Sequence, residues 1–488
     1  MNDSEPTLER GQLSTDVPWG GDPLWSTLKF LAIPGLLAVA ITAFGVRLPG
    51  IVLYGVAGVV AIALFLHTIR DPEWLLAITA IYLPLNKLFV VPIAPGVNGT
   101  NGVLVLLIFA WFLHRHRTPE REQGAKLRPP AAKLVRAYAF VTVFSIVTAL
   151  FTLGTSTVFG DIFAIKAWLD QFIVFFTFLG LVRDGNMARR IMVYMMLGSA
   201  VVLALGFQEW LDKRWLSSID KARLLGPHLQ PNDFGAFLAY SSAPFLALLM
   251  NNIRRVRIWL LTVPYLLPLA KILLATFSRG AYLGMAFAGL IAGYVRGKLF
   301  LAGSALLGLA LLVAMPELIP DSLMARMSQT SNEEVMGEEL DKSSQTRLIL
   351  WNAALDMTAQ SPVFGWGFRS FPRLKSEFTE EPVHESDNHN MYLYLSSQMG
   401  VPAVVLFGLI LWRMYSLGVR VYRQNRQPFA RVIGMSACAL VGATALINMF
   451  GSRMVDICVT VYFWITLALV ARLSMEVDKQ KLSSEGKS

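Results

Sequence analysis

The sequence predicts an all-α, polytopic transmembrane helical bundle, and three observations support this prediction. Hydrophobic residues make up 55% of the 488-residue chain and charged residues only 16%, whereas about a quarter of the residues in a soluble domain are charged. The mean hydropathy is +0.52. Apolar windows recur along the chain, and at about 20 residues each they provide about 12–14 membrane spans. These observations exclude an ordinary soluble enzyme.

The spans are placed on apolar windows that lie between charged residues and Gly or Pro breaks. In the first half of the chain the windows are 28–46, 51–69, 73–92, 102–114, 134–153, 161–182 and 190–210. In the second half they are 232–250, 258–277, 280–295, 298–318, 391–413, 430–450 and 453–472. Because the first 27 residues lack a basic segment followed directly by a cleavable apolar stretch, we expect no signal peptide.

Loop lengths divide the chain into regions. We expect disordered cytoplasmic tails at both ends, an N-terminal transmembrane bundle, a transmembrane core, a loop subdomain and C-terminal spans. The tails are 1–27 and 474–488. The N-terminal bundle is 28–210, the transmembrane core 211–318, the loop subdomain 319–390 and the C-terminal spans 391–473. The loop subdomain ends directly before a span, so its last residues are expected at the membrane surface.

Two segments of this long loop have a predictable character. The acidic stretch 328–346 has few apolar residues and is expected to be mobile. The following segment, 346–360, has apolar residues at helical spacing and predicts an amphipathic helix. These apolar residues are Leu348, Trp351, Ala354, Leu355 and Met357.

The distribution of charge predicts the orientation. The net charge of +10 comes from 43 Lys and Arg against 33 Asp and Glu, and in a membrane protein such an excess favours cytoplasmic anchoring loops over nucleic-acid binding. With a cytoplasmic N-terminus, the basic loops fall on the cytoplasmic side and loop 319–390 falls in the periplasm. These basic loops are 115–133, 183–190, 251–257, 296–298 and 414–429.

Two connections on the predicted periplasmic side are basic against this rule. Loop 211–231 carries Lys213, Arg214, Lys221 and Arg223, and the short connection 278–279 carries Arg279. Charge near the apolar boundary is costly unless it is paired, so these cations favour an anionic ligand on that face. The alternative is a span count that is wrong by one, which would make them ordinary cytoplasmic anchors.

The first two candidate segments lie in these basic connections. Arg223 begins a Gly- and Pro-rich loop that enters a span at Asn232, and helix N-termini and arginines both bind phosphate. The alternative there is a plain re-entry turn capped by Asn232 or Asp233. Arg279 interrupts an apolar sequence and either binds a ligand or reaches the lipid headgroups. Gly280 and Gly284 beside it would let another helix approach closely.

The other two candidate segments lie in the long loop. Arg347 is near the start of the predicted amphipathic helix, and Trp366 lies in a Gly-Trp-Gly turn, where it would either stack on a sugar or anchor at the membrane interface. His389, followed by Asn390, precedes a span and is suited to accept a proton near neutral pH. A metal site is the alternative for the last segment, with His384, Glu385, Asp387 and His389 as ligands. It is disfavoured because the second His has no regular helical spacing and the arginines already supply positive charge.

Taken together, the four segments resemble the O-antigen ligase and O-antigen polymerase superfamily of bacterial glycan transferases. The resemblance covers about 220–410 and consists of four motifs. The first two are Arg-Leu-Leu-Gly followed by Pro-Asn, and Phe-Ser-Arg-Gly. The last two are Pro-Val-Phe-Gly-Trp-Gly, which follows an Arg and a Trp, and His-Asn-Met-Tyr-Leu, which precedes a span. The N-terminal 200 residues match only in having many spans.

This resemblance implies an inverting, metal-independent glycosyltransferase without a cofactor, with a GT-C-like fold in the bacterial inner membrane. Its donor would be an undecaprenyl-diphosphate-linked glycan and its acceptor a glycan or lipid hydroxyl at the periplasmic face. Arg223 and Arg279 would bind the diphosphate, Arg347 would position substrate, and His389 would be the general base. Asn232, Asn390 and Trp366 are further candidate ligands for the diphosphate or glycan. Besides these substrates and membrane lipids, a chain-length regulator is a candidate partner.

Two alternatives stay open at this point. A ligase and a repeat-unit polymerase would share this site, and the ligase is favoured narrowly because a single His-Asn-Met-Tyr-Leu block follows a long loop. A transporter or flippase would have as many spans, but it would usually show repeated halves and charges near the middle of the membrane. Lys166 and Asp170 are the one transporter-like pair, and an internal salt bridge is the favoured interpretation. Cys438 and Cys458 both lie in apolar windows, so neither a disulfide framework nor a thiolate metal site is expected.

Overall fold

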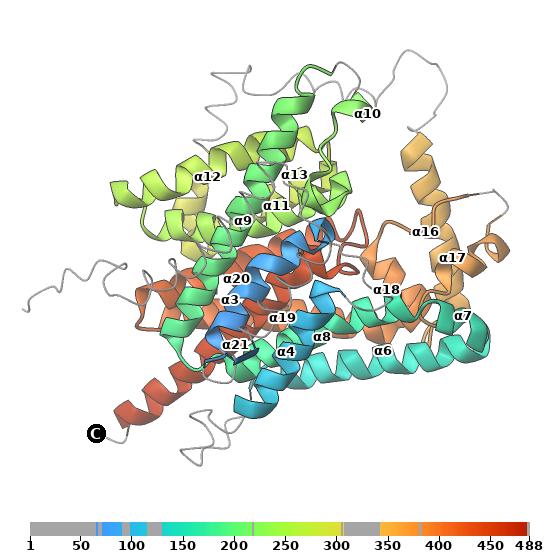
Figure 1. The fold of residues 1–488 in the computed structure, drawn as a ribbon, viewed down its shortest axis with the longest axis horizontal. Helices are drawn as coiled ribbons and strands as arrows, with labels where there is room; N and C mark the ends of the chain where they lie inside the picture. The colour runs from blue at the N-terminus through green and yellow to red at the C-terminus, as the bar shows by residue number, and fades with distance from the viewer. Residues whose placement is uncertain are drawn as a thin grey trace, which may run out of the picture. The chain divides into compact units, whose positions relative to one another are not determined.

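The computed structural model describes residues 65–66, 71–89, 98–114, 129–216, 219–303, 306, 342–379 and 383–485, which contain helices and no strand (Figure 1). Eight helices in this part of the chain are long and apolar enough to cross a membrane. They are α6 (Ala132–Thr152), α8 (Ile162–Leu181), α9 (Gly185–Lys213), α11 (Pro231–Asn251), α12 (Val256–Ala275), α19 (Val401–Gln424), α20 (Pro428–Ile447) and α21 (Ile457–Glu485). The predicted all-α, polytopic bundle is confirmed.

Shorter helices complete the described part. They are α3 (Glu73–Tyr82), η1 (Leu83–Leu88), α4 (Gly99–His114), α7 (Thr155–Gly160), α10 (Ile219–Ala222), η2 (Gly226–His228), α13 (Arg279–Arg296), α16 (Lys342–Gln360), α17 (Phe371–Leu374), η4 (Lys375–Glu377) and α18 (Met391–Met399). Residues 66–488 form one compact unit, which contains all of these helices. The predicted region boundaries at 210, 318 and 390 stay predictions.

Two predicted spans differ from the helices observed. The window 73–92 forms the ten-residue α3 followed by the 3-10 helix η1. The window 391–413 is interrupted at Gly400, where a φ of 82° ends α18 and a new helix, α19, begins at Val401. Glycine adopts this left-handed conformation without the steric cost of a Cβ. The predicted spans 28–46 and 51–69 and most of 298–318 lie outside the described residues, as do the tail 1–27 and most of the acidic stretch 328–346.

Successive helices place two sets of connections at opposite ends of the bundle. Segments 221–230, 276–278 and 448–456 meet at one end, where the Leu224 N–H donates to the carbonyl of Ala275 at 3.2 Å. We call this the cavity end. Segments 182–184, 252–255 and 425–427 meet at the other end, which we call the basic end and which carries Arg183, Arg254, Arg255 and Arg426. This alternation of ends agrees with the predicted alternation of loops.

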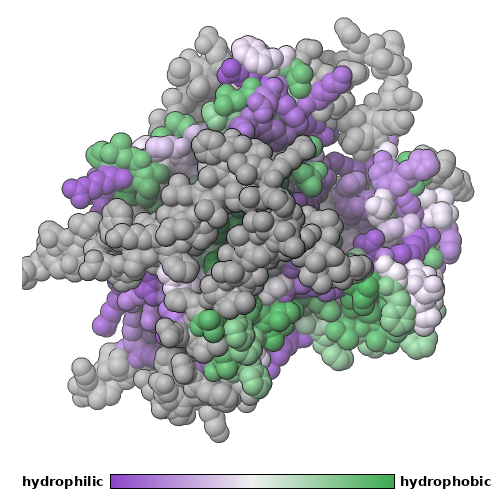
Figure 2. All heavy atoms as spheres, in the orientation of Figure 1, coloured by the Kyte–Doolittle hydropathy of each residue, from purple (hydrophilic) through white to green (hydrophobic). Residues whose placement is uncertain are grey.

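Helix α6 exposes a wide apolar surface. On α6 the large apolar residues Phe140, Val143, Phe144 and Phe151 are 42–86% exposed. Figure 2 shows hydrophobic residues gathered over this helix and hydrophilic residues over α16 and α17. A wide apolar surface on a helix of spanning length is suited to contact with lipid.

Inside α8, Lys166 Nζ lies 2.5 Å from the Oδ2 of Asp170, so the favoured interpretation of this pair as an internal salt bridge is confirmed.

Small residues allow the close packing that forms the cavity end. A Cβ added at Gly284 on α13 would overlap the side chain of Ile447 on α20. A Cβ at Gly235 on α11 would lie 3.0 Å from the Cβ of Ala281 on α13. Glycines permit such close contact between membrane helices. The predicted close approach at this segment is therefore observed, and it brings the starts of α11 and α13 together.

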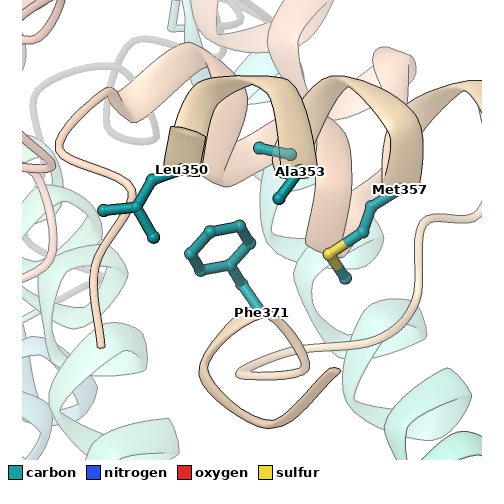
Figure 3. Packing of buried hydrophobic residues seen from close by; sticks show 5 residues of the cluster. Leu350, Ala353, Met357 and Phe371 are labelled. Atoms are coloured by element: carbon teal, nitrogen blue, oxygen red, sulfur yellow. The ribbon is translucent and has the colours of Figure 1, made fainter. Parts of the chain in front are cut away.

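Helix α16 is held by its own apolar cluster, which Figure 3 shows from close by. Leu350, Ala353, Ala354 and Met357 are fully buried against Phe371. The helix was predicted, but its buried face was assigned in part wrongly, because Leu348 is 45% exposed and Leu355 is 52% exposed. The buried residues have the spacing i, i+3, i+4 and i+7, which is one helix face rotated slightly from the predicted face.

Candidate functional site

Four arginines line a cavity of about 200 Å³ at the cavity end of the bundle. We call it the arginine cavity, and none of the described residues that line it is a carboxylate. Its polar lining includes Arg223, Asn232, Arg279, Arg347, His389 and Arg453. Five of these six residues are among the predicted site residues, and they come from α11, α13, α16 and the loops before α11 and α18. The cavity therefore gathers side chains that are up to 230 residues apart in the sequence.

The guanidinium of Arg223 is held in place by its neighbours. Its Nε donates to the carbonyl of Thr276 at 3.3 Å, and its Nη2 donates to Oδ1 of Asn232 at 3.4 Å. The loop that carries Arg223 is fixed in turn by Glu209, whose carboxylate accepts from the N–H groups of Leu225 and Gly226 at 3.1 and 2.8 Å. These contacts orient the arginine before any ligand binds.

Two other cations of loop 211–231, Lys213 and Arg214, have local partners. Lys213 lies 2.7 Å from Glu209 and donates to the carbonyl of Arg223 at 3.0 Å. The guanidinium of Arg214 lies over the ring of Trp215, 4.5 Å from its centroid. Of the four cations predicted to need an anion on this loop, only Arg223 lines the arginine cavity. Lys213 instead supports the loop that positions Arg223.

Arg279 is the first residue of α13, so its side chain and the helix N-terminus lie together. The N-terminus of an 18-residue helix such as α13 carries unpaired N–H groups and a partial positive charge. Both features favour an anion. Together with Arg223, held at the end of α12, they place two sources of positive charge on neighbouring walls of the cavity.

His389 lies in the turn before α18 and faces a carboxylate. Its Nδ1 lies 3.5 Å from Oδ2 of Asp387, and Oδ1 of Asp387 accepts from the Ser452 hydroxyl at 2.7 Å. The indole N–H of Trp351 on α16 donates to the carbonyl of Asn388 at 2.9 Å and so fixes the turn from the other side. A proton on Nδ1, facing Asp387, leaves the Nε2 lone pair available to accept a proton.

The surroundings of His389 also affect its charge. Burial lowers its pKa; Asp387 acts in the opposite direction, and Arg347 and Arg453 lower the pKa further. The pKa is thus below the ordinary value of about 6.5, so the imidazole is neutral at pH 7. A neutral imidazole is the form that can act as a general base.

Arg453 was missed as a site residue in the sequence. It lies between α20 and α21 with only 8% of its surface exposed, and its Nη1 lies 2.6 Å from Oδ1 of Asp233. Its backbone N–H donates to Oδ1 of Asn448 at 3.0 Å. An arginine at the edge of an apolar window is the same signal that pointed to Arg279, and here it could have been used at the start of the predicted span 453–472.

Residues 264–408 match the family model described as O-antigen ligase. This segment is similar to O-antigen ligases, and for that similarity we call it the O-antigen ligase domain. The predicted resemblance to the O-antigen ligase superfamily is thereby confirmed, and no curated protein matches the chain. Arg279, Arg347 and His389 lie inside the O-antigen ligase domain, whereas Arg223, Asn232 and Arg453 lie outside it.

Two predicted site residues of the O-antigen ligase domain do not line the arginine cavity. Asn390 caps α18, and its Oδ1 accepts from the N–H groups of Tyr392 and Leu393 at 2.9 and 3.2 Å. The indole N–H of Trp366 donates to the carbonyl of Met357 at 2.8 Å, and its ring packs against the cluster beneath α16. Both side chains therefore make contacts that stabilise the local structure.

The alternative metal site of the O-antigen ligase domain was assigned to His384, Glu385, Asp387 and His389. In the described part of the chain, no group of three or more His, Cys, Asp or Glu side chains is arranged to hold a metal ion. Asp387 and His389 are neighbours, but His384 and Glu385 are exposed.

Asp387→Asn is expected to change the pH dependence of any reaction in which His389 is the general base. The carboxylate of Asp387 raises the pKa of His389, so removing its charge should lower that pKa and weaken the base. The acid limb of the kcat profile should move to lower pH, and the plateau rate should fall by about tenfold or more because the carboxylate that faces Nδ1 is lost. The check is a pH–rate profile of both proteins, and an unchanged acid limb would contradict this coupling. Glu377→Gln, at an exposed carboxylate that is not among the groups acting on the pKa of His389, is the matched control.

Proposed function

We propose that this membrane protein transfers a glycan from undecaprenyl diphosphate to an acceptor hydroxyl, as an O-antigen ligase. The observation that carries this proposal is the arginine cavity, in which four guanidinium groups and no described carboxylate face a volume of about 200 Å³. Arginine binds phosphate oxygens through a planar, two-donor fork. Such a cavity is suited to a diphosphate, and the O-antigen ligase domain supports a lipid-linked glycan as its carrier.

An apolar groove beside the cavity supports a lipid-linked donor. The groove has a volume of about 360 Å³ and shares Arg279, Gly280, Arg347 and Phe450 with the arginine cavity. Leu283, Leu348 and Trp351 complete its lining, which is mostly apolar. An amphiphile with a diphosphate head and a hydrocarbon chain matches these two neighbouring volumes. We assign the groove to the first isoprene units of the carrier.

The proposed reaction is a single displacement at the anomeric carbon of the donor sugar. His389 Nε2 takes the proton of the acceptor hydroxyl while that oxygen forms the new glycosidic bond. The bond between the anomeric carbon and the diphosphate oxygen breaks at the same time, with inversion, and undecaprenyl diphosphate leaves. Arg223, Arg279, Arg347 and Arg453 neutralise the charge that develops on the leaving group, as preorganised donors do in other transfer reactions.

A transfer assay tests the proposal. The purified protein in detergent is mixed with an undecaprenyl-diphosphate-linked oligosaccharide and either a lipid A core or a second lipid-linked repeat unit. We expect release of undecaprenyl diphosphate and a product on the lipid A core. Product on the second repeat unit alone would assign the polymerase activity instead, and no release with either acceptor would contradict glycan transfer.

The proposed reaction requires the cavity end to face the periplasm, which a labelling experiment can check. A cysteine in place of Ser386, an exposed residue beside the site, should react with a membrane-impermeant maleimide on intact spheroplasts. A cysteine in place of the exposed Arg255, at the basic end, should react only after lysis. Native Cys438 and Cys458 are fully buried, so they should contribute little signal. The reverse pattern would place the site in the cytoplasm.

A further inference from the structure

A second cavity lies next to the turn that carries His389, and it differs in charge from the arginine cavity. Its volume is about 270 Å³. Its lining includes three carboxylates and two arginines, which are Asp233, Asp387, Asp456, Arg369 and Arg453. We call it the carboxylate cavity. With more carboxylates than arginines, it does not favour a diphosphate.

Most of these charges already have partners inside the protein. Asp233 pairs with Arg453 at 2.6 Å, and Asp456 pairs with Nζ of Lys87 at 2.5 Å. Arg369 lies 3.4 Å from Asp161. These pairs leave the lining polar without a large uncompensated charge. It is therefore suited to a neutral ligand with many hydrogen-bonding groups rather than to an ion.

One buried polar atom in this lining accepts no hydrogen bond. Gln398 on α18 lines the carboxylate cavity and is fully buried. Its Nε2 donates to the carbonyl of Tyr394 at 3.3 Å, whereas its Oε1 has no hydrogen-bond partner. A buried polar acceptor without a partner costs about 1–3 kcal/mol. A hydroxyl or amide group of a ligand in the cavity could donate to this oxygen. The ring of Tyr394, which also lines the cavity, adds an aromatic surface.

The position of the carboxylate cavity relates it to the reaction. Arg453 lines both cavities, and Asp387 of the carboxylate cavity lies 3.5 Å from Nδ1 of His389 in the arginine cavity. A ligand in the second cavity thus lies beside the proposed base. Backbone strain also occurs at both cavities, because Arg369 and His389 have φ values of 60° and 55°. Strain of this kind in residues other than glycine is concentrated at functional sites.

We propose that the carboxylate cavity is a carbohydrate subsite that holds a sugar ring of the substrate beside the Asp387–His389 pair. The ring belongs either to the acceptor or to the reducing end of the donor glycan. Its hydroxyl groups donate to Asp387 and to Oε1 of Gln398. This inference rests on the proposed glycan transfer and adds a preference to it. Neutral or amino sugars are favoured over uronic acids, because the subsite presents acceptors rather than free cations.

Two single-cysteine reporters test this subsite with simple probes. Ser386→Cys reports on the carboxylate cavity and Phe450→Cys on the arginine cavity, since each residue lines only one of the two. The probes are methyl glucoside, N-acetylglucosamine, glucosamine, glucuronic acid and inorganic pyrophosphate. We expect at least one neutral or amino sugar to slow maleimide labelling at Ser386→Cys. Pyrophosphate should slow labelling at Phe450→Cys only.

Gln398→Ala in the Ser386→Cys background should weaken the protection by sugar about threefold to tenfold, which is typical for the loss of one hydrogen bond. Ser397→Ala is the matched control, because Ser397 is equally buried on α18 but its hydroxyl donates to the carbonyl of Leu393 in its own helix. In the transfer assay, Gln398→Ala should raise one KM: that of the acceptor if the ring is the acceptor's, or that of the donor if it is the donor's.

Several results would overturn the subsite. They are the absence of protection at Ser386→Cys by all four sugars, equal protection in Gln398→Ala, and a loss of kcat in Gln398→Ala without a change in either KM. If pyrophosphate still protects Phe450→Cys, such a result removes the subsite and leaves the proposed donor site intact. A failure of pyrophosphate at Phe450→Cys would instead contradict the proposed function.

Discussion

Arg279→Ala is expected to lower kcat/KM for glycan transfer by about 30-fold to 1,000-fold, which corresponds to about 2–4 kcal/mol of transition-state stabilisation. Arg279 begins α13 and lines both the arginine cavity and the apolar groove, so it lies where the diphosphate head meets the carrier chain. Its guanidinium would act most strongly on the departing diphosphate, because charge accumulates there as the bond breaks. The measurement is the initial rate of undecaprenyl diphosphate release at several donor concentrations.

Arg279→Lys should recover only part of this activity, since an ammonium group cannot reproduce the planar fork of a guanidinium. Arg254→Ala is the matched control, because it removes an exposed arginine at the basic end. It should change kcat/KM by less than about twofold, as surface substitutions usually have small effects. Activity near wild type in Arg279→Ala would remove diphosphate binding at this residue from the mechanism.

His389→Ala should lower kcat by about 10²–10⁴-fold and leave donor binding largely intact. The reason is that His389 would remove the acceptor proton, whereas the arginines bind the donor. Because burial lowers the pKa of His389, the wild-type rate should remain high at pH values where an ordinary histidine, with a pKa of about 6.5, is already protonated. The rate should fall only when the pH drops through this lowered pKa.

The same assay separates base catalysis from a metal site. His384→Ala and Glu385→Gln replace exposed residues of the same segment and should be mild, and EDTA should not inhibit. A metal site predicts that several of these residues are equally essential and that divalent ions restore activity after chelation. Inhibition by EDTA, or an active His389→Ala protein, would contradict the proposed role of His389.

The cost of placing charge in an apolar window explains why much of the site could be predicted from the sequence. Arg279 and His389 stand out because an ionisable group at a membrane boundary requires a partner or a ligand. Alternation of spans then places Arg223, Arg347 and these two residues at one end of the bundle, which is where the structure has them.

Other features depend on local geometry that the sequence does not show. Trp366 and Asn390 have side chains suited to sugars. The indole N–H of Trp366 instead donates to a backbone carbonyl, and the side chain of Asn390 caps α18. Gln398 has no charge, and only the fold shows that its Oε1 is buried without a donor. The break at Gly400, which divides one predicted span into two helices, likewise follows from a backbone conformation that many glycines could adopt.

The late position of Arg453 in the sequence has a consequence for the order in which the cavity is assembled. Arg453 and Ser452 lie in the connection between α20 and α21, whereas the other arginines of the cavity precede α18. During synthesis, α11, α13 and α16 are therefore made before the connection that completes the cavity wall. A chain released before residue 452 would hold three of the four guanidinium groups and would lack the hydroxyl that bonds to Asp387. The anion site is thus completed late in biogenesis, after nearly all of the chain has been inserted.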